Sequence, residues 1–205
     1  MANFDHLQPS HSTPATEIPT IPYEVNVPPH RLPVEQYGRD RFVALPGLIQ
    51  PDTASSLLAA TDDVPAKRVR VGNNTETWNE QIFTLEHPVY RFFEQDTIVS
   101  LVRALTRLKR INYLQTWTSI YGVGEYINPH TDSEGSAQLL ICLQAPESSA
   151  QGGKLVVSGQ ELFLTPGDAI AFEATSLRHY TTPLTATKNE PEPRRTVLVG
   201  RYFMG

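Results

Sequence analysis

The spacing of hydrophobic positions changes near the middle of the chain. From Val89 to Arg107 apolar residues recur every three to four positions, which predicts helix, and Asp96-Thr97 could break this helix in two. Asp52 predicts the N-cap of a shorter helix that runs to Thr61. From Asn112 onward, short apolar runs separated by Gly and Pro turns predict strands instead.

The predicted strands are short and closely spaced, with no long helix between them. They cover residues 113–121, 126–130, 138–144, 154–157, 160–164, 169–172, 179–184 and 194–204. Earlier strands are expected at 41–49 and 81–85, and the Asn-rich stretch 67–78 is expected to form a loop or an irregular hairpin. This pattern predicts a mainly β fold with flanking helices and an antiparallel sandwich or jelly-roll core.

The first 36 residues differ in composition from the rest. They carry seven prolines among Ser, Thr and His, so neither a helix nor a central strand is expected there. The segment is either a disordered tail, above all in residues 1–17, or an extended arm docked on the domain. We expect residues 37–205 to form one domain, with helical support over about 52–110 and the jelly-roll core over about 112–205.

Charge and cysteine content limit the classes of partner. The net charge of −5 is spread along the 205 residues without a basic stripe, so neither nucleic acid nor a membrane surface is an expected partner. The only cysteine, Cys142, lies inside an apolar run and is expected to be a buried hydrophobic residue. No disulfide framework and no secretory signal pattern are present, so we expect a cytoplasmic protein; its oligomeric state is not predicted.

Candidate chemistry centres on His130-Thr131-Asp132. In an extended strand the side chains at i and i+2 point to the same face, so His130 and Asp132 could present ligand atoms to one point. His179 follows at the start of a later predicted strand. Two histidines and one carboxylate form the facial triad of non-haem Fe(II) oxygenases, which leaves coordination positions open. The absence of thiolate ligands argues against a structural zinc site.

Arg195 is the fourth element of this pattern. A guanidinium grips a carboxylate through two hydrogen bonds, and a buried arginine requires an anionic partner. Arg195 and Arg201 are six positions apart and share a strand face, whereas Arg194 points the other way. Arg195 therefore either binds an anionic co-substrate inside the barrel or is a surface residue of an edge strand.

The ordered set Tyr121, His130-x-Asp132, Gly152-Gly153-x-Leu155, Pro166-Gly167-Asp168, Phe172, His179 and Arg195 resembles the Fe(II)/2-oxoglutarate-dependent dioxygenase superfamily. The resemblance covers residues 112–205 well and residues 40–111 only loosely.

The resemblance implies a double-stranded β-helix (cupin-like) core and a particular set of site residues. His130, Asp132 and His179 would be the Fe(II) ligands and catalytic centre, and Arg195 would pair with the distal carboxylate of 2-oxoglutarate. Tyr121 would contact the co-substrate or be a core aromatic residue, and Arg201 resembles the second arginine of the demethylating branch. O₂ would be the oxidant, with ascorbate as a reductant. Cys142 falls about where some members place a co-substrate-binding tyrosine.

The resemblance also implies an enzyme that oxidises, most simply hydroxylates, an unactivated C–H bond of a small molecule. An amino acid or a secondary-metabolite intermediate is the expected substrate, with succinate and CO₂ as co-products. Asp132 disfavours halogenation, because halogenating members have a small residue in place of the acid. The alternatives are a protein or peptide hydroxylase, an oxidative cyclase or desaturase, and a non-catalytic jelly-roll binding module. Candidate substrate residues, each also compatible with a purely structural role, are Gln138, Trp117, Arg68 and Arg70.

Overall fold

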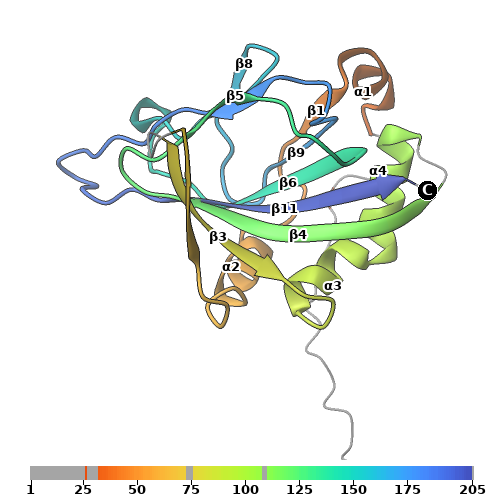
Figure 1. The fold of residues 1–205 in the computed structure, drawn as a ribbon, viewed down its shortest axis with the longest axis horizontal. Coiled ribbons are helices and arrows are strands. Elements are labelled where there is room, and N and C mark those ends of the chain that lie inside the picture. Colours follow the sequence, from red (N-terminus) through yellow and green to blue (C-terminus); the bar gives the residue numbers. More distant parts are fainter. Residues whose placement is uncertain (1–25, 27–31, 73–75, 108–109, 205) are drawn as a thin grey trace, which may run out of the picture.

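Two antiparallel sheets packed face to face form the centre of the protein, and helices cover the outer face of the larger sheet (Figure 1). The computed structural model describes residues 26, 32–72, 76–107 and 110–204. Most of the proline-rich extension expected at 1–36 lies outside these residues, as do Asn73 and Asn74 of the Asn-rich stretch.

The larger sheet has seven strands in the order β1-β9-β6-β11-β4-β3-β2. They are β1 (Phe42–Leu45), β2 (Lys67–Val71), β3 (Glu76–Phe83), β4 (Ile111–Tyr121), β6 (Ala137–Gln144), β9 (Ala169–Phe172) and β11 (Arg195–Met204). The smaller sheet has the order β5-β10-β7-β8, with β5 (Ile127–His130), β7 (Leu155–Val157), β8 (Gln160–Leu162) and β10 (His179–Thr181). The chain crosses repeatedly between the sheets, so the predicted jelly-roll core is confirmed.

Four α-helices flank this core, and they pack on the face of the larger sheet that points away from the smaller one. They are α1 (Val34–Asp40), α2 (Pro51–Ala59), α3 (Pro88–Glu94) and α4 (Asp96–Thr106), and a short 3₁₀ turn, η2, covers Ser149–Gln151. The predicted break in the long helix is confirmed, because Gln95 takes an extended conformation between α3 and α4. No helix in the described part of the chain is long and apolar enough to cross a bilayer.

Two local expectations were wrong, and a third had left two alternatives open. Helix α1 begins at Val34, inside the segment expected to lack helices, because Pro33 precedes it and interrupts no helical hydrogen bond. Helix α2 begins at Pro51 with Gln50 as its N-cap, so Asp52 lies in the first turn. For the stretch 67–78, expected to be a loop or an irregular hairpin, the hairpin alternative holds: β2 and the start of β3 pair in a regular antiparallel register and extend the sheet. Strand β2 is an edge strand, which tolerates the charged side chains that obscured its pattern.

Strand β11 divides the interior into two cores by the alternation of its side chains. Leu198 and Tyr202 point to the helices, whereas Val197 and Val199 point between the sheets. Gly200 lies on the helix face, where a Cβ atom would be 2.6 Å from Cδ1 of the fully buried Phe93. The helix-side core therefore requires a residue without a side chain at this position.

We expect Gly200→Ala to lower the free energy of unfolding by about 1–3 kcal/mol, because Phe93 has no space into which to move. Gly38→Ala is a matched control, since Gly38 lies in α1 and a Cβ there meets nothing within 4 Å. That control should be neutral or stabilising by up to about 1 kcal/mol. Chemical denaturation followed by circular dichroism measures both values, and equal stabilities for the two variants would contradict this packing.

Candidate metal centre

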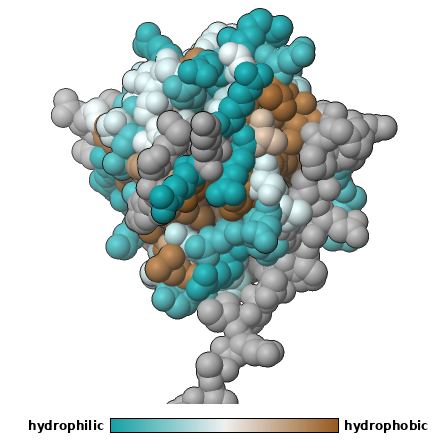
Figure 2. Space-filling model, turned by 90° about the vertical axis from the view of Figure 1, so that its right-hand side faces the viewer, coloured by the Kyte–Doolittle hydropathy of each residue, from teal (hydrophilic) through white to brown (hydrophobic). Residues whose placement is uncertain are grey.

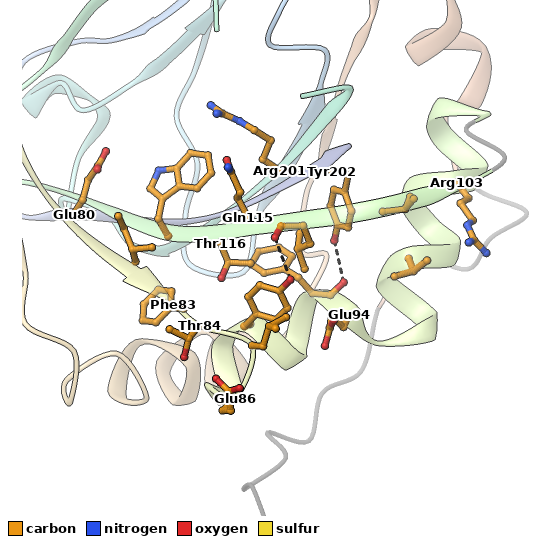
Figure 3. A pocket seen from close by; sticks show the side chains of 18 residues that line it. Glu80, Phe83, Thr84, Glu86, Glu94, Arg103, Gln115, Thr116, Arg201 and Tyr202 are labelled. Atoms are coloured by element: carbon orange, nitrogen blue, oxygen red, sulfur yellow. Dashed lines mark hydrogen bonds between the residues drawn. The ribbon is translucent and has the colours of Figure 1, made fainter. Parts of the chain in front are cut away.

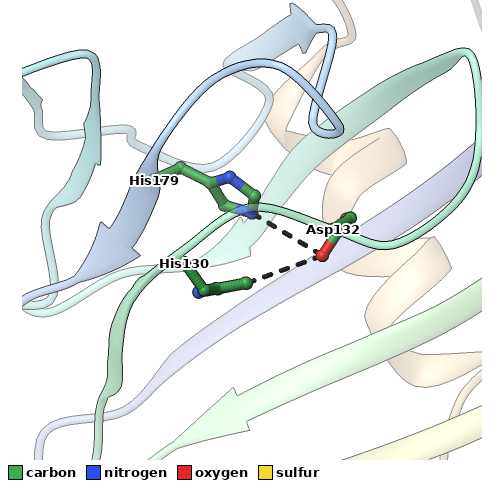
Figure 4. A group of neighbouring side chains, drawn as sticks. All are labelled: His130, Asp132 and His179. Atoms are coloured by element: carbon green, nitrogen blue, oxygen red, sulfur yellow. Dashed lines mark ion pairs between the residues drawn. The ribbon is translucent and has the colours of Figure 1, made fainter.

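Strand pairing in the smaller sheet places two histidines next to each other. His130 at the end of β5 and His179 at the start of β10 are direct partners across antiparallel strands. Their ring centroids are 4.3 Å apart. Asp132 completes the group, and the three side chains offer ligand atoms that all lie within 4.8 Å of one another (Figure 4).

Asp132 lies beside the histidines, as expected, but it is not part of the strand that the sequence predicted for it. Strand β5 ends at His130, so Asp132 lies in the following loop and not on the same strand face. The loop is held because the backbone N–H of Asp132 donates a hydrogen bond to the carbonyl of Ala174, at 2.9 Å. A tertiary contact, and not the pleat of a strand, therefore aims this carboxylate at the histidines.

Both imidazoles have the tautomer that a metal ligand requires. Nδ1 of His130 lies 2.7 Å from the carbonyl oxygen of Asn128, and Nδ1 of His179 lies 2.9 Å from that of Leu177. A carbonyl oxygen only accepts, so each Nδ1 carries the proton. Each Nε2 lone pair is therefore free to bind a metal, and the backbone fixes the orientation of each ring.

The two oxygens of Asp132 have separate partners. Oδ2 accepts hydrogen bonds from the guanidinium of Arg201, at 2.7 Å, and from the side-chain amide of Gln138. Oδ1 faces Nε2 of His130 at 3.6 Å and Nε2 of His179 at 4.0 Å. One oxygen is thus held in place while the other points to the site where a cation would sit.

The ionisation of the three groups follows from their surroundings. Burial would raise the pKa of Asp132, but the facing His130 ring and the charge of Arg201 outweigh it and hold that pKa below its usual value. The Asp132 carboxylate raises the pKa of His130. Burial lowers the pKa of His179, which favours its neutral, metal-binding form. The carboxylate and the more buried imidazole are therefore ready to act as ligands at neutral pH.

Arg195 lies at the other end of the same cavity. Its side chain is 3% exposed, and its Nη2 has no hydrogen-bond partner among the described residues. The guanidinium carbon lies 5.2 Å from the centre of the Tyr121 ring. Burial raises the pKa of the Tyr121 hydroxyl, so Tyr121 is an uncharged phenol. A buried guanidinium nitrogen without a hydrogen-bond partner is costly and indicates a place for an anion.

The cavity between the two sheets measures about 360 Å³, and most of the predicted site residues line it. These are His130, Asp132, His179, Arg195, Tyr121, Arg201, Gln138 and Trp117. Arg201 and Arg195 occupy different ends, since six strand residues span about 20 Å. The structure does not bring Arg68 or Arg70 to the cavity: both are exposed on β2, and Arg68 forms an ion pair with Glu125. On that strand Val71 faces the cavity, so alternation turns the two arginines away.

The sequence did not single out two acidic residues of the cavity wall, Glu76 and Glu80. Both lie on β3, two positions either side of Trp78, and the three side chains share the inner face of the sheet. The period of two along β3 would have revealed them, but residues 67–78 were expected to form a loop or an irregular hairpin, so no regular alternation was applied there.

Searches with the sequence found no relatives: no family model and no curated protein matches the chain. Comparison of the fold with solved structures gave many matches. The chain is similar to a prolyl-4-hydroxylase of Pseudomonas putida, with 13% identity, a TM-score of 0.67, and coverage of 84% of this chain and 97% of that chain. A 2OG-Fe(II) oxygenase family protein of Burkholderia pseudomallei has 15% identity, a TM-score of 0.69, and coverage of 87% and 92%.

The fold is that of the 2OG-Fe(II) oxygenases. A third neighbour, the carbocyclase SnoK of nogalamycin biosynthesis, has 13% identity, a TM-score of 0.66, and coverage of 82% of this chain and 81% of that chain. The fold is thus shared by a prolyl-4-hydroxylase and a carbocyclase, so it does not by itself select a reaction or a substrate.

Burial of Cys142 gives a test of the packing beneath the site. This residue is fully buried on β6, and burial raises the pKa of its thiol to about 11. At pH 8 only about one thiol in a thousand is then ionised, so we expect the native protein to resist alkylation by iodoacetamide. Mass spectrometry should show rapid modification only after unfolding, and native labelling at the unfolded rate would contradict the packing.

Proposed function

We propose that the protein is an Fe(II)- and 2-oxoglutarate-dependent oxygenase that oxidises a C–H bond of a small molecule. The observation that carries this proposal is the pairing, in one cavity, of a converging His-Asp-His group with an unpartnered buried arginine. Neither feature alone indicates an oxygenase, because a group of metal-binding side chains without the arginine also fits hydrolytic and structural metal sites.

The donor set fits Fe(II). Two neutral imidazole nitrogens and one carboxylate oxygen are borderline-to-hard donors, and the three protein ligands leave other coordination positions open. His130, Asp132 and His179 would hold the metal through Nε2, Oδ1 and Nε2. Bound Fe(II) would couple the decarboxylation of 2-oxoglutarate by O₂, which yields succinate and CO₂, to insertion of the second oxygen atom into a substrate C–H bond.

Arg195 fits the far carboxylate of 2-oxoglutarate. Its guanidinium is buried, lies over the Tyr121 ring and lacks a carboxylate partner among the described residues. A dicarboxylate would satisfy the free Nη2 and bring its other end towards the metal centre. The Tyr121 hydroxyl, which is within reach of Thr181 and Ser119, would add a neutral hydrogen bond at this end.

Arg201 and Gln138 act here as positioning residues. They hold Oδ2 of Asp132, so that Oδ1 remains directed at the histidines. The apolar walls formed by Leu140, Val197 and Val199 exclude water from the space between the sheets. A cytoplasmic location, with its supply of 2-oxoglutarate, is consistent with this function. Ascorbate would serve only to keep the iron reduced.

Removal of the carboxylate tests the metal centre. Asp132→Gly should abolish succinate formation from 2-oxoglutarate, and it should weaken Fe(II) binding because only two ligand atoms remain. Anaerobic calorimetry with Fe(II) and a succinate assay provide the two readouts. Asp63→Gly, which removes an exposed carboxylate elsewhere, is the control. Full metal affinity and turnover in Asp132→Gly would show that the ligand assignment is wrong.

Shortening the buried arginine tests the co-substrate site separately. We expect Arg195→Lys to raise the KM for 2-oxoglutarate at least about tenfold, because one point charge replaces a two-pronged donor. Fe(II) affinity should not change, since Arg195 forms no ion pair with any of the three ligand residues, all of which the structure describes. Arg194→Lys, an exposed neighbour, is the control. An unchanged KM for Arg195→Lys would contradict the assignment.

A further inference from the structure

The charged side chains that line the cavity indicate the charge of the substrate; this inference rests on the proposed function. Arg201 is paired with Asp132, and Arg195 is the arginine assigned to the co-substrate. Two further charged side chains, Glu76 and Glu80, line the same cavity from β3. Among the described residues, no Lys or Arg side chain forms an ion pair with either glutamate.

The loaded site would retain a negative charge. Fe(II), Arg195 and Arg201 together carry four positive charges, whereas the 2-oxoglutarate dianion, Asp132 and the two glutamates carry five negative charges. A carboxylate in a partly desolvated cavity is stabilised by a cation that reaches it. A neutral or anionic substrate would leave this charge uncompensated or add to it.

Glu80 is the better placed of the two glutamates. Its Oε1 accepts a hydrogen bond from Nε1 of Trp78 at 2.7 Å, which fixes the direction of the carboxylate. The carboxylate of Glu76 already has a partner in β5, because its Oε2 accepts a hydrogen bond from the backbone N–H of Asn128 at 2.8 Å. Glu80 is also surrounded by aromatic surface: Trp78 lies on one side along the strand, and Trp117 lines the same cavity.

A second cavity continues from this point. A groove of about 960 Å³ runs along β4 where β3 has ended, and it shares Glu80, Trp117 and Arg201 with the cavity between the sheets. Figure 3 shows Glu80, Gln115 and Arg201 on one side of β4, with Glu86 and Glu94 on the other. Ile82 and Leu85, which line this groove, are 65% and 51% exposed. Glu80 therefore lies at the junction between the metal cavity and a more open, partly apolar groove.

We propose that Glu80 is a specificity-determining residue that binds a cationic group, an ammonium or guanidinium, on an otherwise apolar substrate. The cation would lie next to the Glu80 carboxylate and the indole of Trp78, because the Trp117 ring already has the guanidinium carbon of Arg201 4.8 Å from its centre. The apolar body would extend into the groove along β4. Glu80 takes the place of Arg68 and Arg70 as the candidate substrate residue, because neither arginine lines the cavity or the groove.

The test uses three probes with the same six-carbon chain: hexylamine, hexanol and hexanoate. The two tryptophans of the chain, Trp78 and Trp117, both line the cavity, so intrinsic fluorescence reports binding there directly. Each probe is titrated into the full-length protein, alone and loaded with Zn(II) and 2-oxoglutarate, where redox-inert Zn(II) replaces Fe(II). We expect hexylamine to bind at least about tenfold more tightly than hexanol or hexanoate.

The decisive variant is Glu80→Gln, which keeps an oxygen that can accept from Trp78 and removes only the charge. It should weaken hexylamine binding about tenfold and leave hexanol binding unchanged. Glu147→Gln, which removes a charge from an exposed position outside both cavities, should have no effect. Circular dichroism confirms that each variant is folded.

Several outcomes would overturn the proposal: equal responses to the three probes, no response to any, or hexylamine binding that is unchanged in Glu80→Gln. Succinate formation distinguishes failure of the proposed function from failure of the cation site. Selective binding of hexylamine without any succinate formation from 2-oxoglutarate would overturn the oxygenase assignment and leave the cation site intact. Succinate formation without amine preference would overturn the cation site alone.

Discussion

The division of Asp132 between two sets of partners is the interaction on which the site depends. Arg201 and Gln138 hold one carboxylate oxygen from the larger sheet, and the two histidines face the other from the smaller sheet. Asp132 therefore connects the two layers of the jelly roll. An aspartate free to rotate would present either oxygen, or neither, to a metal ion.

Strand register and the helix-side core position the other residues of the site around Asp132. The register of β5 against β10 places His130 opposite His179, and backbone carbonyls two residues earlier fix both rings. Strand β11 contributes both arginines on one face, and its opposite face packs against the helices through Leu198 and Tyr202. The helix-side core thus fixes the strand that carries both the co-substrate residue and the partner of Asp132. Figure 2 shows hydrophilic and hydrophobic residues side by side on one face of the molecule.

Sequence patterns predicted the fold wherever a local rule decided the structure. Alternation and Gly or Pro turns located the strands after Asn112, and helical periodicity located α3 and α4. Prediction failed where tertiary contacts decided. Edge pairing converts the polar stretch 67–71 into β2, and the contact of Asp132 with Ala174 places a loop residue where a strand residue was expected. Glu80 was missed for the same reason, since its role depends on a strand that only the sheet defines. The residues of the His-Asp-His group could be named from the sequence, but the pairing of Arg201 with Asp132 could not.

One measurement tests the central claim most directly: an anaerobic crystal structure of the full-length protein with Fe(II) and 2-oxoglutarate. The account predicts a single iron bound by Nε2 of His130, Oδ1 of Asp132 and Nε2 of His179, with the far carboxylate of 2-oxoglutarate on the guanidinium of Arg195. The density should also show Oδ2 of Asp132 still on Arg201. Iron bound elsewhere, or 2-oxoglutarate absent from the space next to Arg195 at saturating concentration, would contradict it.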